Sequence, residues 1–363
     1  MRIVLTGVAV ICISCVDPIN TKVVETSDHF VVDGRITDGE GPYKITLSST
    51  SNYSANIDGF TKYVSEAKVK VCNENGGCIP FYEITKGHYE TTADVSLATV
   101  GHSYHVDILT KEGQRILSKP EILKASPPIT KVYYEYDINT VTTEGFKVYL
   151  DTDDPANDRN YYKWETLSYF PYSSQCFYEI PGDLKLLLAS DKFTNGNAIS
   201  RIPLQRAYFN RKDYFLVVAY QFSLSENAYA YLENVDKQVT TTGSIFDAPP
   251  TLLRGNLYVP DNDDAIVLGY FAVCGVQEKS VLIDRNLHGV SPFPRSKPLS
   301  DAPCYCGVPC KSDCDFPCNE TCPDSPFNPC LCGAAPCPPA CHYLKGVTSV
   351  APKDWPLPHH PCN

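Results

Sequence analysis

The sequence has few charged residues, almost no methionine and no cluster of basic side chains. Of its 363 residues 20% are charged, Met1 is the single methionine, and the formal net charge is −11. A nucleic acid or an anionic membrane surface would need clustered Lys and Arg, so we expect neither as a partner. The aromatic content of 11%, including 24 tyrosines, is typical of a β-rich extracellular protein.

Common sequence signatures of catalysis are also missing. The chain has no Gly-x-Ser-x-Gly, His-Glu-x-x-His, Gly-x-Gly-x-x-Gly or phosphate-binding loop. His102 and His105 lie in a Tyr-rich strand, a position more typical of half-exposed packing than of a metal pair. We therefore expect a non-enzymatic protein without a cofactor. Paired carboxylates on distant strands, as in glycoside hydrolysis, remain an alternative.

The first fifteen residues predict export. A single basic residue precedes an apolar run from Ile3 to Ile13, and small Ser14 stands before Cys15. The run is too short to span a bilayer as a helix, and it predicts a lipoprotein signal peptide over residues 1–14 with Cys15 acylated. Two or three acyl chains would hold the protein stably on a membrane. An ordinary secretory signal is less favoured, because no small-x-small site follows Cys15.

The next two parts of the chain are a tether and a β-sandwich. Residues 15–27 are polar and predict the tether. Residues 28–125 contain short alternating strands separated by turn residues, which predict an antiparallel, Ig-like β-sandwich ending before Ser126-Pro127-Pro128. The expected strands are Phe30–Ile36, Tyr43–Leu47, Ala67–Val71, Gly87–Thr91, Ser103–Leu109 and Gln114–Lys119.

The second half predicts an α+β domain with a dominant antiparallel sheet over residues 129–286. Its clearest helix runs from the N-cap Ser225 to Val235, and a shorter helix is expected at Asp183–Ala189. Residues 287–363 are rich in Cys and Pro and predict an extension without regular structure. The expected strands are Val132–Tyr136, Gly145–Leu150, Tyr161–Leu167, Tyr214–Tyr220 and Ala265–Val273.

Seventeen cysteines in an exported chain favour disulfides over metal ligands. Cys72 and Cys78 bracket an Asn-Gly turn and are expected to pair, and Cys176 is a candidate partner of Cys274. The number left in the extension is odd, so Cys362 is the candidate free thiol. The other disulfide candidates are Cys304, Cys306, Cys310, Cys314, Cys318, Cys322, Cys330, Cys332, Cys337 and Cys341. The alternative is Zn or Cu(I) bound by these thiolates, although the extension has no Cys-x-x-Cys pair.

Two acidic loops invite a calcium interpretation. The loop Asp151–Asp158 carries several oxygen ligands, but Pro155 stands where an EF-hand needs a third ligand. A solvated turn between two strands explains it better. The segment Asp261–Asp264 has the same two interpretations, and no metal site is expected at either loop.

Short sequence motifs spread over most of the chain resemble those of one family. They include Gln221–Ser225, Ala228–Tyr231, Gly243–Pro250, Gly255-Asn256 and Val267–Phe271, and in the first half Val32–Gly34, Glu66–Val69, Gly87–Tyr89, Gly101–Tyr104, Asp153–Pro155 and Asn160–Tyr162. Their order and spacing resemble the Bacteroidota outer-membrane lipoproteins of the domain of unknown function 4249 (DUF4249). The resemblance covers residues 15 to about 286, and the Cys-rich extension departs from it.

The resemblance implies a location and a partner, but no catalytic residues. It implies an outer-membrane lipoprotein held in the lipid through acylated Cys15, with the cell surface favoured over the periplasmic face. It also implies an accessory or substrate-capture role beside a TonB-dependent (SusC-like) β-barrel receptor. Two alternatives remain: a metal or metallophore binding protein that uses the Cys-rich extension, and a surface hydrolase acting on glycan or peptide.

Overall fold

The computed structural model describes most of the chain between residues 28 and 287. The described ranges are 28–50, 62–92, 98–137, 145–156, 158–171, 177–182, 185–192, 195–208, 214–240, 252–260, 262–284, 287 and 347–348. They contain 19 strands and one helix. The mainly β fold class expected from the sequence is therefore confirmed.

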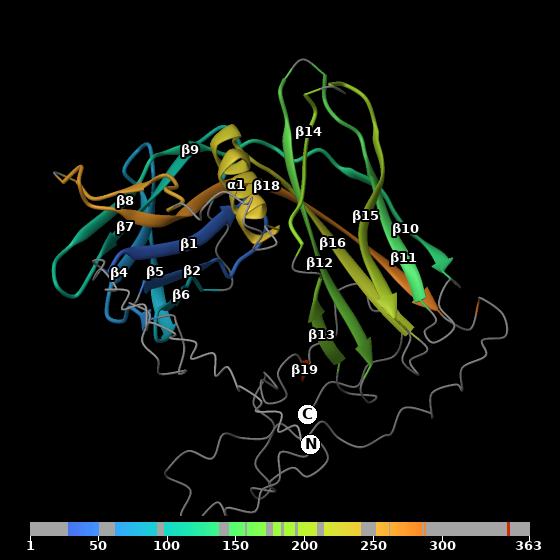
Figure 1. Cartoon of the computed structure of the whole chain (residues 1–363), viewed down its shortest axis with the longest axis horizontal. Helices are drawn as coiled ribbons and strands as arrows, with labels where there is room; N and C mark the ends of the chain where they lie inside the picture. Colours follow the sequence, from blue (N-terminus) through green and yellow to red (C-terminus); the bar gives the residue numbers. More distant parts are fainter. Residues whose placement is uncertain are drawn as a thin grey trace, which may run out of the picture.

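One sheet of 16 strands runs through the whole molecule, and a second sheet has three strands (Figure 1). The main path of the large sheet follows the order β17-β8-β7-β4-β5-β6-β2-β1-β18-β16-β12-β13-β19, with β3, β9 and β14 attached beside it. The first nine strands are β1 (Phe30–Thr37), β2 (Lys44–Ser49), β3 (Lys62–Tyr63), β4 (Lys68–Asn73), β5 (Cys78–Thr85), β6 (His88–Glu90), β7 (Ser103–Leu109), β8 (Arg115–Ser118) and β9 (Glu121–Ile122). The rest are β10 (Ile129–Asp137), β11 (Gly145–Thr152), β12 (Tyr161–Pro171), β13 (Phe177–Pro181), β14 (Leu187–Ser190), β15 (Ile199–Tyr208), β16 (Tyr214–Ser223), the helix α1 (Glu226–Thr240), β17 (Leu257–Tyr258), β18 (Val267–Asp284) and β19 (Val347–Thr348).

The first unit is a sandwich made by folding the large sheet over itself. β5 makes the turn between the two layers, because its residues 78–81 pair with β4 and its residues 82–85 pair with β6. Alternate residues of both layers point inward and form the first core, which includes Val32, Leu47, Val106 and Ile108. Strand β18 adds Phe271 and Val273 to this core, and it pairs with β1 in parallel.

The second unit is formed by β12, β16 and β18 packed against the three-stranded sheet β10-β11-β15. Its core contains Phe146 and Leu150 from β11, Tyr162 and Trp164 from β12, and Val217 from β16 among other residues. Ile283 near the end of β18 also belongs to this core. A single strand of 18 residues therefore contributes side chains to both cores.

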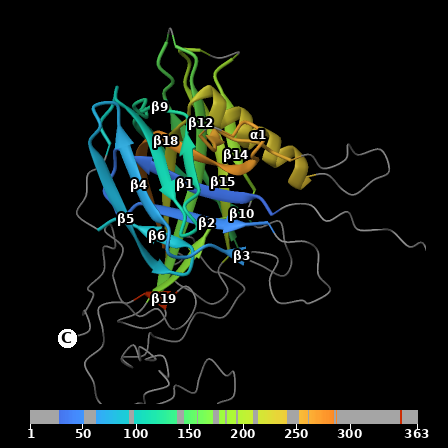
Figure 2. The same ribbon diagram turned by 90° about the vertical axis from the view of Figure 1, so that its left-hand side faces the viewer.

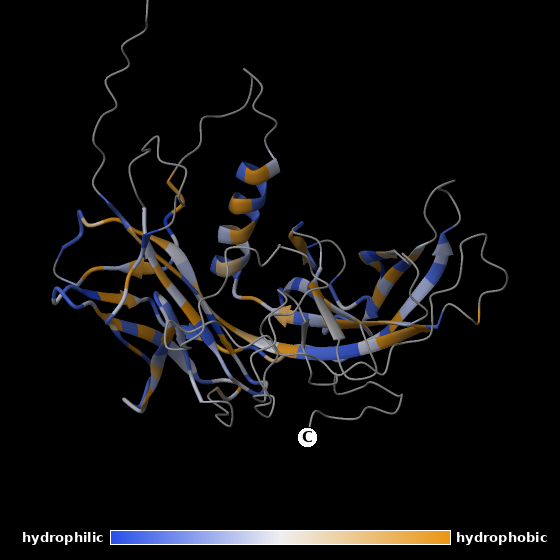
Figure 3. Ribbon diagram, turned by 90° about the horizontal axis from the view of Figure 1, so that it is seen from below, coloured by the Kyte–Doolittle hydropathy of each residue, from blue (hydrophilic) through white to orange (hydrophobic). Residues whose placement is uncertain are grey.

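The two faces of the central sheet have different neighbours. In β18 the odd-numbered residues Phe271, Val273 and Ile283 face the two cores. Even-numbered Tyr270 and Cys274 face the opposite side, where they form a third cluster with α1. Figure 2 shows α1 lying beside β18 and β12, and Figure 3 shows apolar and polar residues alternating along the helix. The helix thus covers part of the sheet face that the β layers leave open.

The segment between the two units crosses β18 at close range. The backbone N–H of Gly275 donates to the Lys124 carbonyl at 2.9 Å, and a Cβ at position 275 would lie 2.3 Å from that oxygen. Just beyond, the buried Gln221 donates to the Pro127 carbonyl at 2.7 Å and accepts from Trp164 Nε1 at 3.0 Å. The connection is therefore bound to the second unit along its length.

Most of the expected elements are confirmed. Each expected strand overlaps an observed one, and α1 begins after Ser225, whose Oγ accepts the N–H of Ala228 at 3.1 Å. The short helix expected at Asp183–Ala189 is wrong: Leu187–Ser190 forms β14, because pairing with β12 overrides the helix preference of Leu and Ala. The extension expected to lack regular structure contributes the two-residue strand β19, which pairs with β13. The boundary at residues 126–128 stays a prediction, although β17 and the start of β18 pack in the first unit.

We expect Gly275→Ala to lower the free energy of unfolding by about 1–3 kcal/mol, because the added methyl group would force the Lys124 carbonyl away from β18. The measurement is urea denaturation followed by circular dichroism. Gly39→Ala is the control, since its methyl group would meet side-chain atoms and no backbone, namely Val276 Cγ1 at 2.9 Å and Thr37 Oγ1 at 3.4 Å. Equal stability of the two variants would contradict this account of the crossing.

Candidate functional site

The described part of the chain contains an open cleft of about 990 Å³. Its floor is the helix-facing side of the central sheet, with residues from β1, β18, β16 and β12. The residues 39–43 that join β1 to β2 form one wall, and Tyr231 and Leu232 of α1 form another. The volume lies at the upper end of the range for small-molecule sites. The cleft therefore lies where the two units share one sheet.

An ion-pair cluster occupies the floor of this cleft. The Arg35 guanidinium of β1 donates to both carboxylate oxygens of Glu165 on β12, at 2.7 and 2.6 Å. Lys163 Nζ lies 2.7 Å from Glu165 Oε1, and the Arg35 guanidinium also lies 4.2 Å from the ring centroid of Phe222. Bidentate pairing and ring stacking fix the Arg35 plane, so the floor is preorganised.

The neighbouring charges keep these groups ionised. Burial alone would raise the pKa of Glu165, but the hydrogen bonds and charges of Arg35 and Lys163 outweigh burial and lower this pKa to about 2. Burial would likewise lower the pKa of Arg35, yet Glu165 raises it overall. Glu165 therefore remains a carboxylate at any physiological pH and is unsuited to donate a proton.

Aromatic rings line the side of the cleft next to the helix. Tyr231 of α1 packs on Tyr270 of β18 with ring centroids 5.1 Å apart, and Tyr220 is stacked on Phe222 at 6.4 Å. Tyr270 and Phe222 are buried, whereas Tyr220 and Tyr231 are half-buried. The cleft thus presents two partly exposed tyrosine rings beside its ion-pair floor.

A buried carboxylate fixes the start of the helix. Glu121 Oε1 accepts hydrogen bonds from the Tyr270 hydroxyl and from Ser225 Oγ, the latter at 2.9 Å. Burial raises the pKa of Glu121, and burial together with the charge of Glu121 raises the pKa of Tyr270. Because Glu121 belongs to the first unit and Ser225 caps α1, this contact positions the wall of the cleft.

The expected pairing of Cys274 with Cys176 is wrong. Cys274 carries a free thiol that is 1% exposed, and its S–H donates to the Ile36 carbonyl at 3.8 Å. Burial raises the pKa of this thiol to about 12, despite the nearby charges of Arg35 and Lys163. Cys274 is therefore an inert packing residue beneath the cleft, and Cys176 lies outside the described residues.

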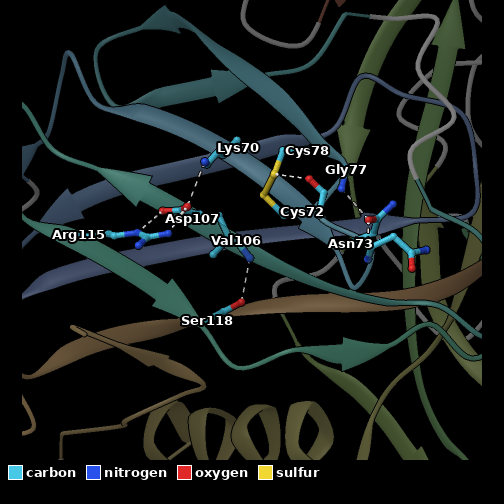
Figure 4. The surroundings of a disulfide bond; sticks show 11 residues. Lys70, Cys72, Asn73, Gly77, Cys78, Val106, Asp107, Arg115 and Ser118 are labelled. Carbon is cyan, nitrogen blue, oxygen red and sulfur yellow. Dashed lines mark hydrogen bonds and ion pairs between the residues drawn. A yellow bond between two sulfur atoms is a disulfide. The ribbon is translucent and has the colours of Figure 1, made fainter. Parts of the chain in front are cut away.

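The disulfide expected between Cys72 and Cys78 is confirmed (Figure 4). The two cysteines face each other on β4 and β5, and Asn73 closes the turn by accepting the Gly77 N–H at 2.9 Å. The lipidation residue Cys15 lies outside the described residues, as do all other candidate cysteines: Cys304, Cys306, Cys310, Cys314, Cys318, Cys322, Cys330, Cys332, Cys337, Cys341 and Cys362. Their predicted roles stay predictions.

One residue of the acidic loop before β12, Asp154, departs from the solvated turn we expected. Asp154 is 6% exposed and accepts hydrogen bonds from the Tyr162 hydroxyl at 2.7 Å and the Gly196 N–H at 2.9 Å. The expectation of a solvated turn is thus wrong for Asp154, whose carboxylate ties two loops together. In the second acidic segment, Asp263 and Asp264 are exposed. Within the described ranges, no group of three or more His, Cys, Asp or Glu side chains is arranged to hold a metal ion.

Sequence reasoning missed the charged floor. Arg35 and Glu165 are 130 residues apart, so no local motif contains both. The sequence does show charged residues on one face of strands that are otherwise β-branched or aromatic, and this pattern could have indicated the site. Arg35, Lys163 and Glu165 are such residues. Among the described helices, none is both long and apolar enough to cross a bilayer.

We expect Cys274 to be unreactive toward iodoacetamide in the folded chain, because it is buried and its pKa is about 12. Peptide mapping should find it alkylated only after denaturation, while Cys72 and Cys78 stay in one disulfide-linked peptide until reduction. Modification of Cys274 in the native state, or a peptide that joins it to Cys176, would contradict this assignment.

The folded chain should lose stability in acid through Glu165. The lowered pKa of Glu165 contributes stability above the unfolded value of about 4.3, and this contribution disappears as the pH falls toward about 2. We expect the wild type to be more stable than Glu165→Gln at pH 6, and this difference to shrink between pH 4.3 and about 2. Thermal unfolding across this range is the measurement, with Glu112→Gln in the exposed β7–β8 turn as control. A constant difference between wild type and Glu165→Gln would refute the ion-pair assignment.

Comparisons with known proteins identify a family. The model of the family described as domain of unknown function (DUF4249) matches residues 16–280. No curated protein matches the chain. Among solved structures, the tetra-tandem repeat in the extending region of a large adhesion protein matches at 11% identity with a TM-score of 0.17, and the match covers 70% of this chain and 74% of that chain. The family match spans more than half of the chain and agrees with the resemblance found in the sequence, so this protein belongs to the DUF4249 family.

Proposed function

We propose that this protein is an outer-membrane lipoprotein, held in the lipid through acylated Cys15, that serves a TonB-dependent (SusC-like) transporter as a non-enzymatic accessory or substrate-capture subunit. The expected signal peptide over residues 1–14, followed directly by Cys15, supports the location. The family resemblance of the sequence supports the partner. We further propose that the protein is displayed on the cell surface.

The single observation that carries the capture role is the open cleft of about 990 Å³ on the central sheet. A capture subunit needs a site that is accessible, preorganised and reversible. The ion pairs of Arg35 with Glu165 and of Lys163 with Glu165 preorganise the floor, and the half-buried Tyr231 provides apolar contact area. These features support ligand binding without chemical turnover.

The charge state of Glu165 argues against a glycosidase that would use this residue as its proton donor. A glycosidase needs a carboxylic acid with a raised pKa as proton donor. Glu165 has instead a pKa lowered to about 2, and both its oxygens are bound by cations. The metal-binding alternative concerns cysteines outside the described residues, and nothing in the described part favours it.

We expect the protein, purified from native outer membranes in mild detergent, to bring a large β-barrel receptor with it in a stoichiometric amount. An affinity tag can be inserted at Glu112-Gly113, in the exposed turn between β7 and β8. Mass spectrometry of the co-purified material gives the readout. Cys15→Ser is the matched control: it should leave the membrane fraction, because the acyl chains are lost. Recovery of the tagged wild type alone would refute the accessory role.

A further inference from the structure

The charged residues that line the cleft are of both signs and nearly balance. Arg35, Lys44 and Lys163 carry three positive charges, and Asp33, Glu40, Glu165 and Glu278 carry four negative charges. The Asp33 carboxylate lies close enough to act electrostatically on both Arg35 and Tyr231. An anionic ligand would have to compete with Glu165 for its two cations, and a cationic ligand would have to compete with those cations for Glu165. A neutral ligand with many hydroxyl groups can donate to the carboxylates and accept from the cations without breaking any pair.

The backbone of the floor is largely paired within the sheet. Strands β1, β16 and β12 lie between two neighbours, and β18 pairs with β1 through residues 267–274 and with β16 through residues 275–284. A peptide that binds by strand addition needs a row of unpaired backbone N–H and C=O groups at a sheet edge, and none of these four strands is an end strand of the sheet. We therefore expect recognition to come from side chains, which here include planar charged groups held in fixed orientations.

The aromatic rings at the edge of the floor provide an apolar surface beside the charged side chains. Tyr220 and Tyr231 are half-buried, and each packs on a buried ring, Phe222 and Tyr270 respectively. Supported in this way, each ring keeps its orientation while part of it stays accessible. The C–H faces of pyranose rings pack well on such surfaces, while their hydroxyl groups reach the neighbouring charged side chains. The cleft volume of about 990 Å³ is sufficient for a short oligosaccharide.

We infer that the cleft binds a neutral oligosaccharide, with its hydroxyl groups on Asp33, Lys163 and Glu165 and one sugar ring against Tyr231. This inference rests on the proposed capture function, for which it names the class of substrate. It does not depend on the identity of the transporter.

Saturation-transfer NMR on the full-length acylated protein tests the inference. The detergent must have no sugar headgroup, because a maltoside would compete for the site. The neutral probes are maltotriose, cellotriose, mannotriose and triacetylchitotriose, and the comparison probes are trigalacturonate and trialanine. We expect at least one neutral probe to bind and both comparison probes to give no signal.

Variants assign the binding to the cleft. Asp33→Asn removes an exposed carboxylate from the floor, and Tyr231→Ala removes a ring; each should weaken binding at least about tenfold. Glu135→Gln is the matched control, because Glu135 is paired with Arg201 on the three-stranded sheet away from the cleft, and it should bind as the wild type does. Circular dichroism confirms that each variant is folded.

Three outcomes would overturn the inference: no signal from any neutral probe, binding of trigalacturonate or trialanine in their place, or neutral binding that both cleft variants leave unchanged. The test is independent of the membrane experiment. A protein that co-purifies with a barrel but binds no neutral probe would keep the accessory role and lose the sugar assignment. A protein that binds sugar but purifies alone would do the reverse.

Discussion

The pairing of β18 with both β1 and β16 is the constraint on which the rest of the structure depends. The strand pairs with β1 through residues 267–274 and with β16 through residues 275–284. Because side chains alternate along a strand, this one register decides which residues of both units enter a core and which face the cleft. A shift by one residue would place Tyr270 and Cys274 in the first core and Phe271 in the cleft. The two units thus share one continuous sheet and are not separate modules joined by a flexible linker.

The same strand pairing brings together the charged residues of the cleft floor. Arg35 and Glu165 come from different units, and they meet because β1, β18, β16 and β12 lie side by side. Partly burying such charges costs desolvation energy, which their mutual hydrogen bonds offset. Removing Glu165 would leave Arg35 and Lys163 without their shared carboxylate partner, so the cluster also couples the two units. The cleft depends on this contact, so it keeps its shape only while the two units keep their relative positions. Preorganised binding requires such a fixed shape.

Much of the fold follows from local sequence pattern, and the parts that do not have identifiable causes. Alternation of β-branched residues locates β1, β7 and β16, and Ser225 marks the start of α1. The expected strand ended at Val273, because the polar run Gln277–Lys279 shows no β-branched alternation, and the second half of β18 is a strand because it pairs with β16. Strand β15 was hidden by Pro203, which sits at a register irregularity against β11. The cleft could not be predicted from the sequence, since its floor is formed by residues that are more than a hundred positions apart.

The helix shows how the remaining wall of the cleft is kept in place. Only Ala228 of α1 is fully buried, so hydrophobic packing alone holds the helix weakly. Its first turn is instead fixed by Ser225, which caps the helix and donates to the buried Glu121, while Tyr270 donates to the same carboxylate. Burying a carboxylate is costly, as the raised pKa of Glu121 reflects, and its hydrogen bonds to Ser225 and Tyr270 offset part of this cost while they join three elements. Because Tyr231 lies less than two turns further along the helix, the Glu121 contact sets the place of the ring that borders the charged floor.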